Sequence, residues 1–108
     1  MSGKLLKNST TTDTRTELIR DPATYRKYAE QARRTIQQAN GRALVSDEHP
    51  VVLEGSWHGS KSVFREFDSV EAARAWYESP DYQAIVGLRQ ASTESNAVIL
   101  HEIEVRTT

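Results

Sequence analysis

The sequence predicts one α+β domain with the element order β-α-β-β-α-β, and three observations support this prediction. Apolar residues recur at helical spacing in two stretches, residues 22–39 and 70–90. Stretches that alternate in polarity or are rich in β-branched residues surround them, at residues 11–19, 42–53, 62–67 and 97–105. The chain of 108 residues is long enough to build one hydrophobic core.

The first strand is predicted at residues 11–19, where threonine alternates with charged residues. Both of its faces are unusually polar for a strand that this element order places in the centre of the sheet. Its polar groups must be satisfied inside the sheet, face a wet cavity or cross an interface between subunits. Residues 1–10 are polar and lack a period, so we expect a flexible tail there and a domain that covers residues 11–108.

The first helix is expected to begin behind Asp21, with Pro22 in its first turn, and to stop at Asn40-Gly41. Residues 42–46 and 51–53 follow, as two strands or as one strand interrupted at residues 47–50. In either arrangement we expect both pieces to belong to the sheet.

A loop is expected at residues 57–60, and the next strand at residues 62–67. Ser69 then caps the second helical stretch, which Ser79-Pro80 divides, because proline suits the first turn of a new helix behind a serine cap. Trp76, Tyr77 and Tyr82 therefore gather at a helical elbow. A polar connection at residues 92–96 should lead to the last strand, residues 97–105.

Two helices of this arrangement cover one face of a four-stranded sheet and leave the other face for a partner. We expect the last strand to offer Ile99, Ile103 and Val105 to that uncovered face. Burial of the face against a second copy of the chain would give a symmetric homodimer.

Composition excludes several classes of protein. The chain has no cysteine, which rules out disulfides, thiolate nucleophiles and thiolate metal sites, and which fits a reducing cytoplasm. The formal net charge is −1 and no face gathers lysine and arginine, so nucleic acid is not an expected partner. The sequence contains no apolar run of membrane-spanning length, so we expect no membrane partner and a cytoplasmic location.

Three histidines are candidates for chemistry. His101 stands in the middle of the alternation Ala97, Ile99, His101, Ile103, where an imidazole could shuttle protons. The more common role of such a residue is to be hydrogen-bonded in a core or interface, and we favour that reading. The other two, His49 and His58, lie in loops without metal-ligand spacing, so no metal site is expected.

Two arginines are candidates for binding an acidic ligand. Arg65 shares a strand face with apolar residues and therefore needs either a carboxylate of the protein, such as Asp13, Glu17 or Glu66, or an anionic substrate. Arg89 could pin the end of its helix to a carboxylate or point into the space beneath the helices. Our sharpest hypothesis is that both line one pocket beside Tyr77.

Four aromatic residues, Trp57, Trp76, Tyr77 and Tyr82, could line a cavity for an aromatic ligand. Aromatics at helical spacing are mostly core, so we assign Trp76 and Tyr82 to packing and leave Tyr77 and Trp57 open between the two roles. We found no nucleophile elbow and no glycine-rich phosphate loop. Gly87 lies inside a helix, where it could allow close packing.

The motifs also carry a resemblance that covers residues 18–102. The chain resembles the family called domain of unknown function 1330, in the dimeric α/β-barrel superfamily, through Ala72–Gln83 and Arg89, and upstream through Asp21–Tyr25, Tyr28, Gly41–Leu44 and Leu53–Gly55. The resemblance implies a ferredoxin-like fold and a dimer with sheets packed face to face. The polar first strand departs from the family, whose members usually carry an apolar one there.

The resemblance also implies two alternative functions. One is an enzyme without a cofactor, monooxygenase- or cyclase-like, on a small aromatic or polyketide-like substrate, with Tyr77, His101, Arg65 and Arg89 as candidate catalytic residues. The other is a non-catalytic module that binds a metabolite or a partner.

Overall fold

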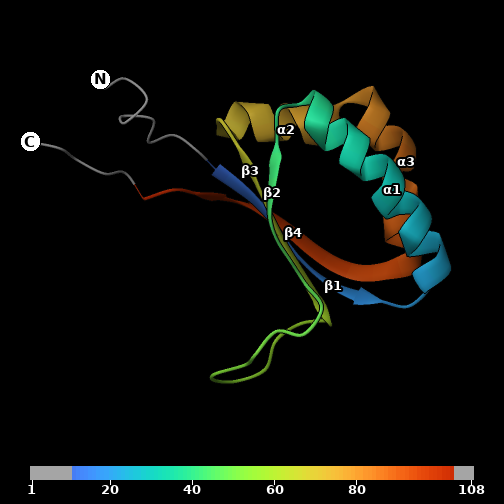
Figure 1. The fold of residues 1–108 in the computed structure, drawn as a ribbon, viewed down its shortest axis with the longest axis vertical. Helices are drawn as coiled ribbons and strands as arrows, with labels where there is room; N and C mark the ends of the chain where they lie inside the picture. The colour runs from blue at the N-terminus through green and yellow to red at the C-terminus, as the bar shows by residue number, and fades with distance from the viewer. Residues whose placement is uncertain (1–10, 104–108) are drawn as a thin grey trace, which may run out of the picture.

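The computed structural model describes residues 11–103, which form four strands and three helices in the predicted order (Figure 1). The elements are β1 (Thr11–Ile19), α1 (Pro22–Gln38), β2 (Arg42–Asp47), β3 (Lys61–Phe67), α2 (Val70–Glu78), α3 (Pro80–Ser92) and β4 (Thr93–His101). The predicted tail at residues 1–10 lies outside the described residues.

The strands form one antiparallel sheet in the order β2-β3-β1-β4, so the polar strand β1 is central, as predicted. The three helices lie together on one side of this sheet, with α1 and α3 side by side (Figure 1). The other side carries no element of the described chain. The domain is therefore a two-layer α+β sandwich of the ferredoxin-like type.

The helix boundaries follow from local capping. Asp21 accepts a hydrogen bond from the amide of Thr24 and begins α1, and Ser69 does the same for α2 through Ala72. Ser79 ends α2 and caps α3 through the amide of Tyr82, which confirms the predicted break at Pro80. α1 stops before Asn40, whose φ of 60° is the left-handed conformation common at helix ends.

Two sequence-based expectations about strands are wrong. Residues 51–53 are not in the sheet: β2 ends at Asp47, and the loop that follows projects away from the sheet (Figure 1). These residues have β-propensity but face no partner strand. The polar connection expected at residues 92–96 does not exist either, because β4 begins at Thr93, directly after α3.

The orientation predicted for the last strand is also wrong. Ile99 pairs with Asp13 and lies on the helix-covered face, where it packs against the core. Val98 and Leu100 occupy the uncovered face instead. Ile103 lies beyond the end of β4 and Val105 lies outside the described residues. The predicted alternation is real, but it points to the opposite layer.

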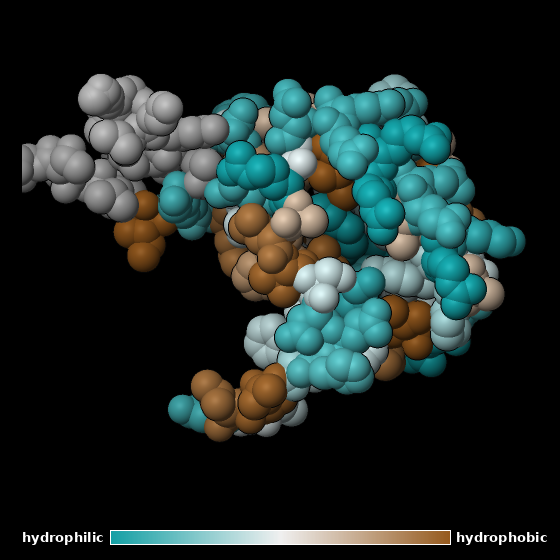
Figure 2. All heavy atoms as spheres, in the orientation of Figure 1, coloured by the Kyte–Doolittle hydropathy of each residue, from teal (hydrophilic) through white to brown (hydrophobic). Residues whose placement is uncertain are grey.

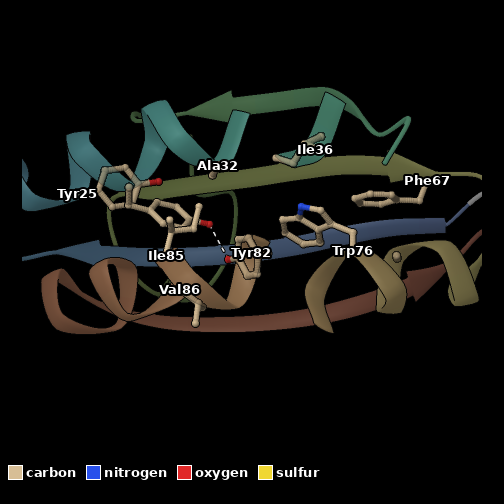
Figure 3. Packing of buried hydrophobic residues seen from close by; sticks show 10 residues of the cluster. Tyr25, Ala32, Ile36, Phe67, Trp76, Tyr82, Ile85 and Val86 are labelled. Carbon is tan, nitrogen blue, oxygen red and sulfur yellow. Dashed lines mark hydrogen bonds between the residues drawn. The ribbon is translucent and has the colours of Figure 1, made fainter. Parts of the chain in front are cut away.

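The core lies between the helices and the sheet and is rich in aromatic rings (Figure 3). The ring of Trp76 lies between Tyr82, at a centroid distance of 4.2 Å, and Phe67, at 5.4 Å. Its indole Nε1 donates to Thr35 Oγ1 of α1. The packing roles predicted for Trp76 and Tyr82 therefore match their positions, since they are 3% and 0% exposed.

Candidate functional site

The charged side chains of β1 point beneath the helices. Asp13, Arg15 and Glu17 alternate along the strand, and all three are buried at 5% exposure or less. Burial of several charges in one layer is costly unless they are paired and hydrogen-bonded. The polar side chains of the first strand therefore find their partners mainly inside the sandwich. This was one of the three outcomes open from the sequence.

Arg15 is the centre of this buried cluster. Its Nε lies 3.2 Å from Glu17 Oε1, and its Nη1 donates to the hydroxyl of Tyr28 at 3.0 Å. Glu17 in turn accepts a hydrogen bond of 2.6 Å from Tyr25. Arg15 Nη2 and Glu17 Oε1 are nevertheless buried without a hydrogen bond. The cluster is paired in charge but incompletely satisfied in hydrogen bonds.

A chain of hydroxyl groups connects this cluster to α3. The hydroxyls of Tyr28 and Tyr82 are 2.7 Å apart (Figure 3), and Arg89 Nε donates to Tyr82 at 3.3 Å. Burial, and next the carboxylate of Glu17, raise the pKa of Tyr25 above its usual range. Burial and then Tyr28 raise the pKa of Tyr82 in the same way. These buried phenols are neutral near pH 7 and act as structural hydrogen-bonding groups.

A groove of about 490 Å³ opens between α2 and β4, and we call it the elbow groove. Its hydrophobic lining includes Tyr77, Ile99 and the nearly buried Trp76. Polar groups enter from both layers: Asp13 and His101 from the strands, Arg74 and Glu78 from α2. The remaining lining residues are Val70, Ala73, Ala97 and Val98. A hydrophobic hollow with a few polar groups is the usual form of a small-molecule site.

His101 and Tyr77 are the sequence candidates that this groove brings together. His101 is exposed at the end of β4, on the helix-covered face. Of the two structural roles favoured from the sequence, the core role is therefore wrong, and the interface role stays a prediction. Tyr77 is 36% exposed, with its ring 6.3 Å from that of Trp76. An imidazole and an aromatic wall in one hollow can hold a planar molecule and exchange a proton with it.

The two candidate arginines, Arg65 of β3 and Arg89 of α3, do not line the same hollow. Arg65 Nη1 donates to Asp13 Oδ2 at 3.4 Å, so the internal partner considered from the sequence exists. Its side chain lines a groove between α1 and the strands β2 and β3. Arg89 points beneath the helices and lines a different hollow near β4, together with Tyr77.

Trp57 does not join the other aromatics. It lies in the projecting loop, is 52% exposed, and donates through Nε1 to Ser62 Oγ. Its neighbour His58 contacts Thr16 Oγ1 on the uncovered side of β1. Trp57 is therefore not part of the aromatic cluster that we considered as one cavity.

The sequence reasoning did not identify the buried cluster of Arg15, Glu17, Tyr25 and Tyr28 as a unit. The alternation of charges along a strand predicted to be central was the signal that could have found it. Among the described residues, no group of three histidine, aspartate or glutamate side chains is arranged to hold a metal ion. Within the same part of the chain, no helix has both the length and the hydrophobicity to span a bilayer.

Solved structures with this fold include proteins of unknown and of known activity. One from Rhodopseudomonas palustris, of unknown function, superposes with a TM-score of 0.76 at 17% identity and covers 91% of this chain and 85% of its own. SnoaB from Streptomyces nogalater, a cofactor-independent oxygenase, has a TM-score of 0.60 at 13% identity, with 93% and 96% covered. A dimeric protein of unknown function from Bacteroides fragilis with a ferredoxin-like fold has a TM-score of 0.59 at 11% identity, with 85% and 95% covered.

No curated protein matches the sequence. A family model does match, over residues 15–103, which includes the central strand from Arg15 onward, all three helices and the elbow. The chain belongs to the family described as Domain of unknown function (DUF1330).

Proposed function

We propose that this protein is a homodimeric enzyme that works without a bound cofactor on a small aromatic or polyketide-like substrate in the elbow groove. The observation that carries the proposal is the position of His101 in the same hollow as Trp76 and Tyr77. The volume of about 490 Å³ is in the usual range for ligand sites. The likeness in fold to a cofactor-independent oxygenase agrees with this class of reaction.

The chemistry that fits these groups is removal of a proton from an acidic C–H next to an aromatic ring. The imidazole of His101 takes the proton, and the guanidinium of Arg74 offers positive charge to the developing enolate. The aromatic wall orients the flat substrate against β4. The resulting electron-rich anion can react with O₂, so that a ring CH₂ and O₂ become a carbonyl group and water.

Anthrone is a suitable probe because its ring CH₂ lies between two aromatic rings and is acidic. Under nitrogen in D₂O, the protein should accelerate loss of the CH₂ proton signal in ¹H NMR over the rate in buffer. His101→Gln should lower this acceleration about 100-fold, the usual contribution of a general base. Under air, the same samples report whether anthraquinone and water are formed.

His49→Gln is the matched control, because His49 is an exposed histidine of the loop after β2 and does not line the groove. It should leave the exchange rate unchanged. Equal rates for the wild-type protein and His101→Gln would refute the assigned role of His101. Exchange no faster than in buffer, despite binding of anthrone, would refute the enzyme and support a binding module.

The binding module is the second candidate, and one observation favours it. The hydroxyls of Tyr25, Tyr28 and Tyr82 all bond to other groups of the protein. Their orientation is fixed by the fold and not by a ligand, so these three hydroxyls are not free to take part in a reaction. Binding of anthrone without proton exchange is the result that this candidate predicts.

The uncovered face of the sheet supports a homodimer. Val45, Phe64, Thr14 and Val98 lie in register across all four strands on this face. Val98 and Leu100 are 52% and 47% exposed in the single chain. Hydrophobic residues also gather at the tip of the projecting loop (Figure 2). A second sheet packed on this face would bury these groups, and one protein of the same fold is dimeric.

Light scattering of the full chain at micromolar concentration should give the mass of two chains. Leu100→Asp places a charge on the uncovered face and should yield monomers. Ala84→Asp, on the exposed side of α3, is the control and should remain dimeric. A monomeric wild-type protein would contradict the proposed assembly.

A further inference from the structure

A second groove, of about 360 Å³, runs between α1 and the strands β2 and β3, and we call it the cationic groove. Three of its lining residues carry positive charge: Arg33 of α1 and Lys61 and Arg65 of β3. No aspartate or glutamate belongs to its lining, and it shares no lining residue with the elbow groove. A groove lined by charges of one sign attracts ligands of the opposite charge.

The positive charge of Arg65 is only partly compensated by the protein. Its side chain is 11% exposed, and its ion-pair partner among the described residues is Asp13, at 3.4 Å. The same carboxylate oxygen, Oδ2, lies 3.9 Å from Arg15 Nη1, so two guanidinium groups share it. Burial, and next the charge of Arg15, lower the pKa of Arg65 from its usual value.

Lys61 and Arg33 are also without a carboxylate partner among the described ion pairs. The ammonium of Lys61 lies over the ring of Tyr25, 4.8 Å from its centroid. This contact holds the charge beside a hydrophobic wall but does not neutralise it. The buried carboxylates of Asp13 and Glu17 pair with Arg15 and Arg65, so Lys61 and Arg33 leave the groove with a net excess of two positive charges.

The three cations are spread along the groove. Tyr25 meets Lys61, and Ile36 lines the groove further along α1. Lys61 and Arg65 are four residues apart on one face of β3, so their Cα atoms are about 13 Å apart at the rise of a strand. Between them the groove is lined by Val63 and Ala29. A single carboxylate is too short to reach both Lys61 and Arg65.

We propose that the cationic groove binds a linear dicarboxylate whose hydrocarbon middle lies on Val63 and Ala29, with one carboxylate at Lys61 and the other at Arg65 and Arg33. Two negative charges match the two uncompensated positive charges. Guanidinium groups suit the second carboxylate because they can bond to both of its oxygens. This site is independent of the reaction proposed for the elbow groove.

Isothermal titration of the full chain with suberate at low ionic strength tests the proposal, with octanoate and adipate as comparisons. Suberate should bind at least about tenfold more tightly than octanoate, which has the same number of carbons but one charge. Adipate, which is shorter, should bind more weakly than suberate. Equal affinities for suberate and octanoate, or no heat with suberate, would overturn the proposal.

Arg33→Gln and Arg34→Gln form a matched pair of variants, because both residues are exposed arginines of α1 and Arg33 alone of the two lines the groove. Arg33→Gln and Lys61→Gln should each weaken suberate binding about fivefold or more. Arg34→Gln should change it less than about twofold. An equal loss in Arg33→Gln and Arg34→Gln would show attraction by the general charge of α1 and would overturn the assigned site. None of the three variants removes an ion-pair partner of Asp13, so we expect each of them to fold.

Discussion

The hydroxyls of Tyr28 and Tyr82, which are 54 positions apart in the chain, form a buried hydrogen bond of 2.7 Å that joins α1 to α3. Each hydroxyl also meets a guanidinium group, Arg15 on one side and Arg89 on the other. The bond therefore links the central strand to both long helices. Within this sandwich, polar contacts and aromatic packing occupy the same layer.

Removal of the Tyr82 hydroxyl should destabilise the fold. Tyr82→Phe keeps the ring but removes the buried acceptor of Arg89 Nε and one of the two hydrogen-bond partners of the Tyr28 hydroxyl, which keeps Arg15. The expected cost is about 1–3 kcal/mol in the free energy of unfolding. Urea titration of the two proteins measures the difference. Tyr77→Phe, at the exposed neighbouring tyrosine, is the control and should have a small effect. Equal midpoints for wild type and Tyr82→Phe would show that the bond adds nothing.

Stability should fall at alkaline pH because of the buried phenols of Tyr25 and Tyr82. The pKa values of Tyr25 and Tyr82 are raised in the folded state by burial, whereas an unfolded tyrosine ionises at about pH 10. Above that pH the unfolded chain releases protons that the folded chain keeps, so the stabilisation present below pH 10 is progressively lost as pH rises.

Urea titrations at a series of pH values from neutral to alkaline measure this dependence. Tyr82→Phe should flatten the alkaline decline, since it removes one of the shifted groups, and Tyr77→Phe should not. A wild-type protein whose stability is constant across the tyrosine range would contradict the prediction.

Removal of one partner of the Arg15–Glu17 ion pair should strongly destabilise the fold. Both side chains are at most 1% exposed, so Arg15→Met leaves a buried carboxylate without its counter-charge and should cost about 3–5 kcal/mol. The double variant Arg15→Met with Glu17→Leu should be more stable than the sum of the two single changes predicts. Thermal and urea unfolding of all four proteins give the coupling energy.

An exposed ion pair provides the comparison. Arg20 and Glu94 pair at the surface, where both side chains are more than half exposed. Arg20→Met should cost no more than about 1 kcal/mol. Similar losses for Arg15→Met and Arg20→Met would show that the buried cluster is relaxed by water and not held by the pair.

Local signals in the sequence predicted most of the architecture. The caps at Asp21, Ser69 and Ser79 act on residues within the next turn, so each could be read from its neighbours. The family resemblance added the topology, because membership of this family implies a ferredoxin-like fold. The central position of β1 followed from the element order.

Long-range partners explain what the sequence could not predict. Alternation shows that Ala97, Ile99 and His101 share a face, but it does not show which layer that face meets. That choice depends on the register with β1, in which Asp13 pairs with Ile99. The same holds for the elbow groove, because its residues come from β1, α2 and β4.

Two glycines should respond in opposite ways to substitution by alanine. Gly87 is an exposed residue inside α3, and a Cβ built there has no atom within 4 Å. The expected close packing at this position is therefore absent. Gly87→Ala should raise the free energy of unfolding by about 0.5–1 kcal/mol, since alanine loses less backbone freedom in a helix.

Gly59 has a positive φ of 78°, and its Cβ would lie 2.3 Å from the backbone oxygen of Glu17. That oxygen accepts a hydrogen bond from the backbone amide of Ser60, and this bond holds the projecting loop against the end of β1. Because backbone cannot move aside as a side chain can, Gly59→Ala should destabilise the protein by more than about 1 kcal/mol. Thermal unfolding of both variants shows whether each substitution raises or lowers the stability. A Gly59→Ala variant as stable as the wild type would show that this loop is not held against β1 in solution.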